Sequence, residues 1–154
     1  MTRTIALALA ASMVAVSAMA QDFIVVSSTD AALKKGQALN AGQRIALAPG
    51  KTFTAIRTSG EVLVFKGAAN GVIMPGAATP ERDQWRFGAL MSLVQPPPEG
   101  RTFGATRGDG LCPEVAAMTT LSQIVRADEA GCVSQARSAF EAYLTRQAAD
   151  APIS

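Results

Sequence analysis

The chain has 154 residues, with 14 basic and 12 acidic side chains, no histidine and a formal net charge of +2. This near balance gives no reason to expect nucleic acid as a partner, because phosphate binding needs a strongly basic surface. The absence of histidine excludes Ser-His and Cys-His catalysis, and two cysteines are too few for a zinc site. The sequence therefore predicts a protein that is not an enzyme and that holds no metal or cofactor.

Residues 1–20 have the pattern of a secretory signal peptide. Arg3 supplies the positive charge, residues 5–16 form an apolar run without a charge, and Ala18-Met19-Ala20 is a small-x-small cleavage site. The apolar run is shorter than the roughly 20 residues that a transmembrane helix needs, and no stop-transfer charges follow it. We expect cleavage before Gln21, a periplasmic location, and no membrane span in the remaining 134 residues.

Residues 21–78 are predicted to form a small antiparallel β-barrel or sandwich lobe. Short apolar or β-branched runs alternate here with turn residues, as in small antiparallel sheets. The expected strands cover residues 23–26, 44–47, 52–58, 61–65 and 72–74. Pro49-Gly50 and Ser59-Gly60 are the expected two-residue turns of two linked hairpins. Runs that are apolar at consecutive positions indicate strands that are buried on both faces.

Residues 79–148 are predicted to form a helical lobe, after a Pro/Gly/Ala linker at 75–80 and before a flexible tail at 149–154. The first helix is expected to begin at Pro80, with Thr79 as its N-cap, to run to about Val94 and to end before three prolines at 96–98. Its apolar residues recur with helical spacing, and we expect this face to pack against the β-lobe, an exposed groove for a partner being the alternative. A last helix is expected over residues 133–147.

Cys112 and Cys132 are expected to form one structural disulfide, since an exported pair of thiols meets an oxidising compartment. A continuous helix from Pro113 to Arg126 would be about 21 Å long, whereas bridged Cα atoms lie about 4.4 to 6.8 Å apart. Either the helix after Pro113 is short, or residues 127–131 run back nearly fully extended, and we favour the short helix. The predicted class is α+β, with a β-lobe followed by a helical lobe that holds the disulfide.

The basic side chains of the β-lobe are candidate contacts for a partner. Residues 22–78 carry six basic and three acidic side chains, whereas residues 79–154 carry seven and nine. Scattered surface charge explains this balance equally well, because the basic residues form no run. The candidate contacts for an envelope protein or for peptidoglycan are Arg44, Lys51, Arg57 and Lys66.

Two other functions stay open at this level. A small-ligand or glycan carrier would need an open pocket inside the β-lobe, lined by Phe23, Phe53, Phe65 and Ile73. A carboxylate-dependent envelope hydrolase would need acids that converge in one cleft with a raised pKa, the candidates being Asp109, Glu114, Asp128 and Glu129.

Three segments of the β-lobe, residues 33–39 (LKKGQAL), 41–47 (AGQRIAL) and 58–63 (TSGEVL), carry a resemblance to a known family. Their glycine spacing and apolar alternation resemble the FecR-like β-domain of bacterial envelope proteins. FecR-like domains are non-catalytic and bind partners or envelope ligands, so the resemblance implies an exported binding or assembly module of the cell envelope. It supplies no functional residue. Signalling members of the family have a membrane-spanning segment, which is not expected in the mature chain here.

Overall fold

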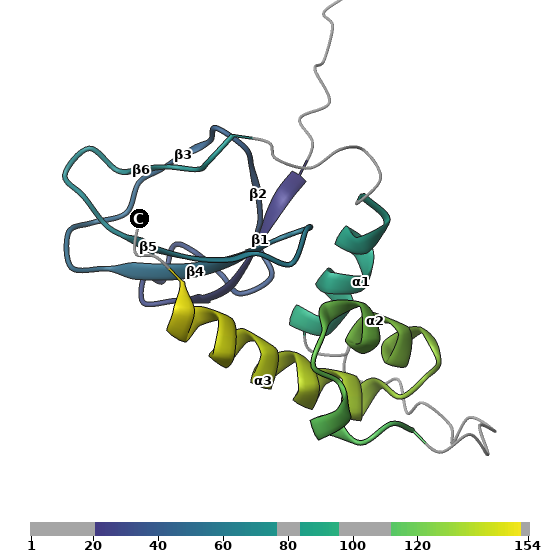
Figure 1. Ribbon diagram of the computed structural model, residues 1–154. Helices are drawn as coiled ribbons and strands as arrows, with labels where there is room; N and C mark the ends of the chain where they lie inside the picture. The colour runs from purple at the N-terminus through teal and green to yellow at the C-terminus, as the bar shows by residue number, and fades with distance from the viewer. Residues whose placement is uncertain (1–20, 77–83, 96–111, 152–154) are drawn as a thin grey trace, which may run out of the picture.

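The computed structural model describes residues 21–76, 84–95 and 112–151 (Figure 1). The expected signal peptide, the first residues of the expected first helix, the prolines at 96–98 and Asp109 lie outside these ranges.

An antiparallel sheet of four strands forms the centre of the molecule. Its order is β2-β1-β4-β5, with β1 at Gln21–Ser28, β2 at Ala38–Asn40, β4 at Thr52–Arg57 and β5 at Val62–Lys66. A separate two-stranded ribbon consists of β3 (Arg44–Ile45) and β6 (Val72–Ile73). β1 is buried continuously from Asp22 to Val26, which confirms the prediction of strands buried on both faces.

The α+β class is confirmed, but the four strands do not close into a barrel and the β-lobe is sandwich-like. The expected hairpin across Pro49-Gly50 is wrong, because β3 pairs with β6 and not with β4. Pro49 and Gly50 still form a tight turn, in which the Lys51 N–H donates to the Ala48 carbonyl at 3.0 Å. This turn carries the chain from the ribbon into the sheet. Such pairing between distant segments leaves no local signal in the sequence.

The turn between β4 and β5 is also different from the expected one. Arg57 N–H donates to the Glu61 carbonyl at 2.8 Å, so three residues form the loop. Gly60 has φ +99°, a left-handed conformation that favours glycine.

Within the described ranges, the helices that follow the sheet are α1 (Gln84–Val94), the short 3-10 helix η2 (Val115–Ala117), α2 (Leu121–Glu129) and α3 (Val133–Asp150). The expected short helix after Pro113 is a single 3-10 turn. α2 begins at a capping box, in which the Thr120 hydroxyl accepts from Gln123 N–H and the Gln123 side chain accepts from Thr120 N–H. α3 continues three residues beyond the expected Gln147.

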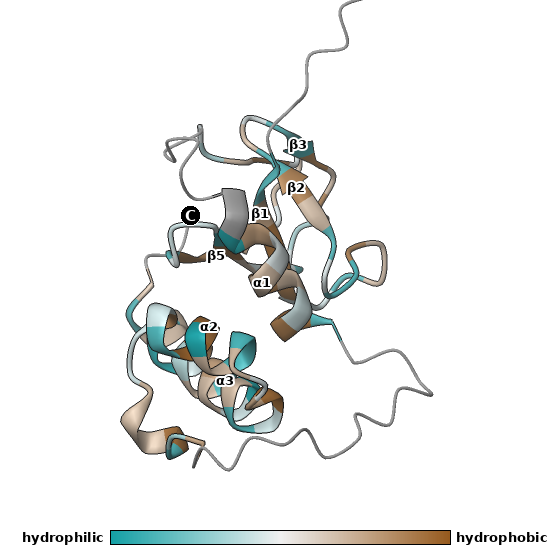
Figure 2. Cartoon of the chain, turned by 90° about the vertical axis from the view of Figure 1, so that its right-hand side faces the viewer, coloured by the Kyte–Doolittle hydropathy of each residue, from teal (hydrophilic) through white to brown (hydrophobic). Residues whose placement is uncertain are grey.

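The two faces of the sheet belong to two different cores. Alternate residues of β1 point to opposite faces, so Ile24 and Val26 join the helices while Phe23 and Val25 face the ribbon. Leu90, Leu93 and Val94 of α1 are buried with the first pair, which confirms the expected packing of this helix. The helices lie together on one side of the sheet (Figure 1), and each contains hydrophobic segments, as does β1 (Figure 2).

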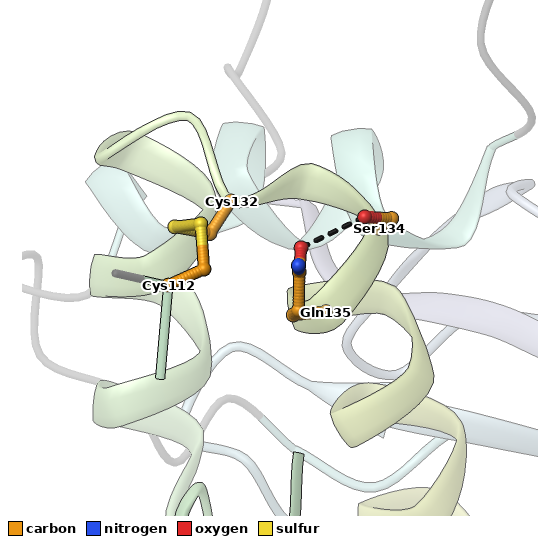
Figure 3. The surroundings of a disulfide bond; sticks show 4 residues. All are labelled: Cys112, Cys132, Ser134 and Gln135. Carbon is orange, nitrogen blue, oxygen red and sulfur yellow. Dashed lines mark hydrogen bonds between the residues drawn. A yellow bond between two sulfur atoms is a disulfide. The ribbon is translucent and has the colours of Figure 1, made fainter. Parts of the chain in front are cut away.

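The predicted disulfide is present. Cys112 and Cys132 are joined with their Cα atoms 5.7 Å apart (Figure 3). Cys132 is buried directly before α3, whereas Cys112 is exposed and precedes η2. The bond therefore fixes the beginning of the η2 segment to the beginning of α3.

Candidate functional site

A groove of about 730 Å³ lies where two loops of the β-lobe meet. One loop leads from β3 to β4 and the other from β5 to β6. We call it the loop groove; its walls are Asp30, Arg44, Ala46, Leu47, Ala48, Pro49, Ala68, Ala69, Asn70 and Gly71.

Two glycines bring these loops together. A Cβ atom on Gly67 would lie 1.9 Å from the Ala48 carbonyl oxygen, so no other residue fits there without movement of the backbone. Gly71 has φ +74°, and its Cβ would lie 2.6 Å from the Ile45 carbonyl oxygen. The close approach of the two loops, and hence the shape of the groove, depends on both positions.

The groove combines one fixed cation with small apolar walls. The exposed Arg44 guanidinium donates from Nη1 to the Asn70 carbonyl at 3.0 Å, which holds this side chain against the second loop. Asp30 supplies a carboxylate on the same groove, and its Oδ1 accepts from Ala32 N–H at 2.9 Å. The remaining walls are mostly alanine, proline and backbone. This composition can bind an apolar segment together with a charged group.

Three of the four predicted contact residues lie at or beside the loop groove. Arg44 lines it. Lys51 and Lys66 are exposed and directly adjoin its loops, since the Gly67 N–H donates to the Lys51 carbonyl at 2.8 Å. The Lys51 ammonium donates to the Thr29 carbonyl at 3.3 Å. The backbones of Lys51 and Lys66 thus flank the groove loops, while the Arg44 side chain lines the groove itself.

Arg57, the fourth, has a different role. It is only 8% exposed, its Nη1 lies 2.7 Å from Glu61 Oε2, and its guanidinium carbon lies 4.8 Å from the centre of the Phe23 ring. The register that pairs Phe23 with Arg57 places the side chain over this ring. Arg57 therefore stabilises the β-lobe and is not available to a partner at the surface.

The aromatic residues expected to line a carrier pocket are packed against one another. Phe23, Phe53 and Phe65 are buried on the ribbon side of the sheet, and the rings of Phe53 and Phe65 stack with their centres 4.7 Å apart. Ile73 is 58% exposed on β6. These four side chains do not line one open pocket, because the rings fill the space between the sheet and the ribbon.

The candidate acids that the structure describes have separate surroundings. Glu114 and Glu129 are exposed, whereas Asp128 is half-buried and its Oδ2 accepts from the Ser92 hydroxyl at 2.9 Å. This bond connects α2 to α1. Over the described ranges, no cluster of three or more histidine, cysteine or acidic residues is arranged to bind a metal ion.

Sequence reasoning missed Asp30, Asn70 and the two glycines of the loop groove. Pro49-Gly50 was predicted as a turn, and Asn70-Gly71 has the same turn chemistry; loops that meet in the fold are a common place for binding residues. The sequence could not show that the two turns meet, because this depends on the pairing of β3 with β6.

Compared with protein-family models, curated proteins and solved structures, the chain matches none. Within the residues that the structure describes, none of the helices has both the length and the apolar character needed to span a membrane. The disulfide between Cys112 and Cys132 fits an exported protein.

Proposed function

We propose that this protein is an exported, non-enzymatic binding or assembly module of the bacterial cell envelope, located in the periplasm, and that it contacts a partner through the loop groove. The observation that carries this proposal is the position of Arg44. Its guanidinium is held on the groove wall by Asn70, beside small apolar residues, and Lys51 and Lys66 adjoin the same loops. A pre-positioned cation beside an apolar groove favours a partner that presents both apolar and acidic groups.

Two further observations support the envelope as the place of action. A disulfide between Cys112 and Cys132 is typical of proteins that fold in an oxidising compartment. The resemblance to FecR-like domains remains a prediction, and it agrees with a non-catalytic binding role. Envelope proteins and peptidoglycan are the two partner classes that follow, since both carry accessible carboxylates.

In-cell crosslinking of the tagged protein, followed by mass spectrometry of the adducts, tests this function. The informative variant replaces Arg44, Lys51 and Lys66 together by Ala. We expect it to lower the adduct yield by about tenfold, because charged contacts in a binding site commonly dominate encounter and affinity.

A matched control replaces three exposed basic residues elsewhere, Lys34, Lys35 and Arg126, and so changes the net charge by the same amount. Its adduct yield should equal that of the parent protein. Equal losses in both variants would show a general charge effect, and a parent protein without reproducible adducts would contradict the binding function itself.

A further inference from the structure

β5 is an edge strand of the four-stranded sheet, and its register shows which of its backbone groups face outward. Neighbouring pairs in an antiparallel ladder alternate between hydrogen-bonded and non-bonded. The Arg57 N–H donates to Glu61 and the Gly67 N–H donates to Lys51, both at 2.8 Å, at the two ends of the β4–β5 ladder. The odd-numbered residues of β5 therefore bond to β4, while the N–H and C=O groups of Val62, Val64 and Lys66 point away from it.

In the part of the chain that the structure describes, these outward groups form a row of donors and acceptors with no partner strand. Among the described residues, no backbone hydrogen bond reaches the outward groups of Val62, Val64 or Lys66. Such a row is a template for an additional strand, because it offers main-chain hydrogen bonds at regular spacing. The strand is also rich in β-branched and aromatic residues, with the sequence VLVFK.

Charge determines which kind of strand fits this edge. The exposed Lys66 ends it, and Lys51 lies next to that end through its hydrogen bond to Gly67. At the opposite end, Glu61 is already paired with Arg57 at 2.7 Å. A second copy of β5 could at best place Lys66 against a valine, and a shift in register brings the two lysines together. An edge lysine thus disfavours self-pairing and favours a partner strand with an acid.

We propose that the β5 edge binds an extended segment of another protein by strand addition. The segment runs antiparallel to β5, with β-branched residues opposite Val62 and Val64 and an acidic residue opposite Lys66. β5 leads directly into Gly67 and the groove wall at Ala68, so the edge strand and the loop groove are neighbours along the chain. This inference rests on the proposed binding function and selects a protein, not peptidoglycan, as the partner.

Amide hydrogen exchange of the full exported protein, followed by NMR, tests the edge directly. In the free protein we expect the amides of Val62, Val64 and Lys66 to exchange at least about 100-fold faster than those of Leu63 and Phe65, which bond to β4. Equal protection of both sets would show that the edge is already covered, and would overturn the proposal.

The probe is an acetylated and amidated peptide, ETVTVTV, at millimolar concentration. We expect it to protect the three outward amides, and its counterpart KTVTVTV to bind about threefold to tenfold more weakly, since like charges opposite each other are unfavourable. An ETVTVTV peptide that is N-methylated at alternate residues should give no protection. If ETVTVTV gives none, or if the N-methylated peptide binds equally well, strand addition is overturned.

Two variants separate the edge from a general effect on folding. Val64→Pro removes one outward N–H and leaves the β4 ladder intact, so it should abolish protection by the peptide without loss of the fold. If the Val64→Pro variant does not fold, Lys66→Gln provides the test. Lys66→Gln should weaken binding of ETVTVTV about threefold, whereas Lys34→Gln should leave it unchanged. Shifts confined to the loop groove, with no protection on β5, would overturn the edge proposal alone, because the crosslinking experiment tests the binding function independently.

Discussion

Gly60, at the residue scale, joins the sheet to the helices. The Tyr143 hydroxyl donates to the Gly60 carbonyl at 2.8 Å, and a Cβ atom on Gly60 would lie 3.0 Å from Leu121 Cδ2 and 3.2 Å from the Tyr143 oxygen. Both the positive φ and the close contact with the helices therefore favour glycine at this position.

We expect Gly60→Ala to lower the free energy of unfolding by about 2 to 3 kcal/mol, as measured by urea denaturation. Gly50→Ala is the matched control, since Gly50 has φ +83° but no atom within 4 Å of the added Cβ. It should lose only about 1 kcal/mol. Equal losses would mean that the contact with α2 and α3 contributes nothing.

Tyr143 gives the molecule an alkaline sensitivity. Burial raises the pKa of its phenol above 10.0, and the nearby Arg146 partly opposes this shift. The phenol ionises more readily in the unfolded chain, so its contribution to stability is complete below the unfolded pKa and is lost as the pH rises through the folded pKa. We expect stability to fall above about pH 10, and to fall less in Tyr143→Phe.

Denaturation at pH 8 and at pH 11 measures this difference. Ionisation can be followed by ultraviolet absorbance without ambiguity, because Tyr143 is the single tyrosine of the chain. At neutral pH, Tyr143→Phe should cost about 1 kcal/mol through the lost bond to Gly60. A folded phenol that titrates at or below its ordinary pKa would contradict the expected sign.

At the same scale, the buried position of Arg57 could not be predicted from the sequence. A single arginine in a predicted strand suits a solvated position, and the sequence offers no means to place it elsewhere. Only the register that pairs Arg57 with Phe23 puts its guanidinium over a buried ring and beside Glu61. The stabilising role of Arg57 depends on how the strands pair, and a local sequence pattern holds no information about that pairing.

At the scale of elements, the disulfide holds together the two ends of the segment that contains η2 and α2. The bond joins residues 20 positions apart and closes a loop that contains both of these helices. We expect replacement of Cys112 and Cys132 by Ser to lower the free energy of unfolding by about 3 kcal/mol, because the unfolded chain gains entropy. Differential scanning calorimetry measures this change, and the reduced parent protein should behave like the variant. Equal melting temperatures for variant and parent would argue against a structural bond.

The elements with a local pattern were predicted, whereas their pairing was not. Short apolar or β-branched runs predicted β1, β3, β4, β5 and β6, and helical periodicity predicted α1 and α3. β2 was missed because Ala38-Leu39-Asn40 contains one large apolar residue. Thr120 and Gln123 have the spacing of a capping box, which indicates the start of α2. The neighbouring β-branched residues weakened the helix prediction there, and this start was not predicted.

At the scale of the whole molecule, the helices share their core with the sheet. Ile24, Val26, Ile56 and Val62 of the strands are buried among residues of all three α-helices. Among the described residues, the helices thus have no core separate from the sheet, and we expect these parts of the chain to unfold in one cooperative transition.

Circular dichroism at 222 nm and NMR signals of β5 should therefore give the same midpoint in urea. Ile56→Ala, at a fully buried position, should shift both midpoints together and cost about 3 kcal/mol. Earlier loss of the helical signal would show that the helices unfold independently.

The candidate site was accessible to prediction only in part. Arg44, Lys51 and Lys66 were selected from the basic balance of the β-lobe, and the structure places them at or beside the loop groove. The groove itself results from the close approach of two glycine-containing loops, and the outward groups of β5 result from its place at the edge of the sheet. Both features depend on how the strands assemble, so a local sequence pattern could not predict them.

The alternation of β1 between two cores has a consequence for how this protein can change over evolutionary time. Phe23 and Val25 pack in the core on the ribbon side, while Ile24 and Val26 pack in the core with the helices. The dividing surface between the two halves therefore runs through the plane of the sheet and not across a linker in the chain. Substitutions in the helices can accumulate with compensating changes at alternate strand positions, while the ribbon and its groove are inherited unchanged. A lineage could in this way replace its helical layer and retain the loop groove.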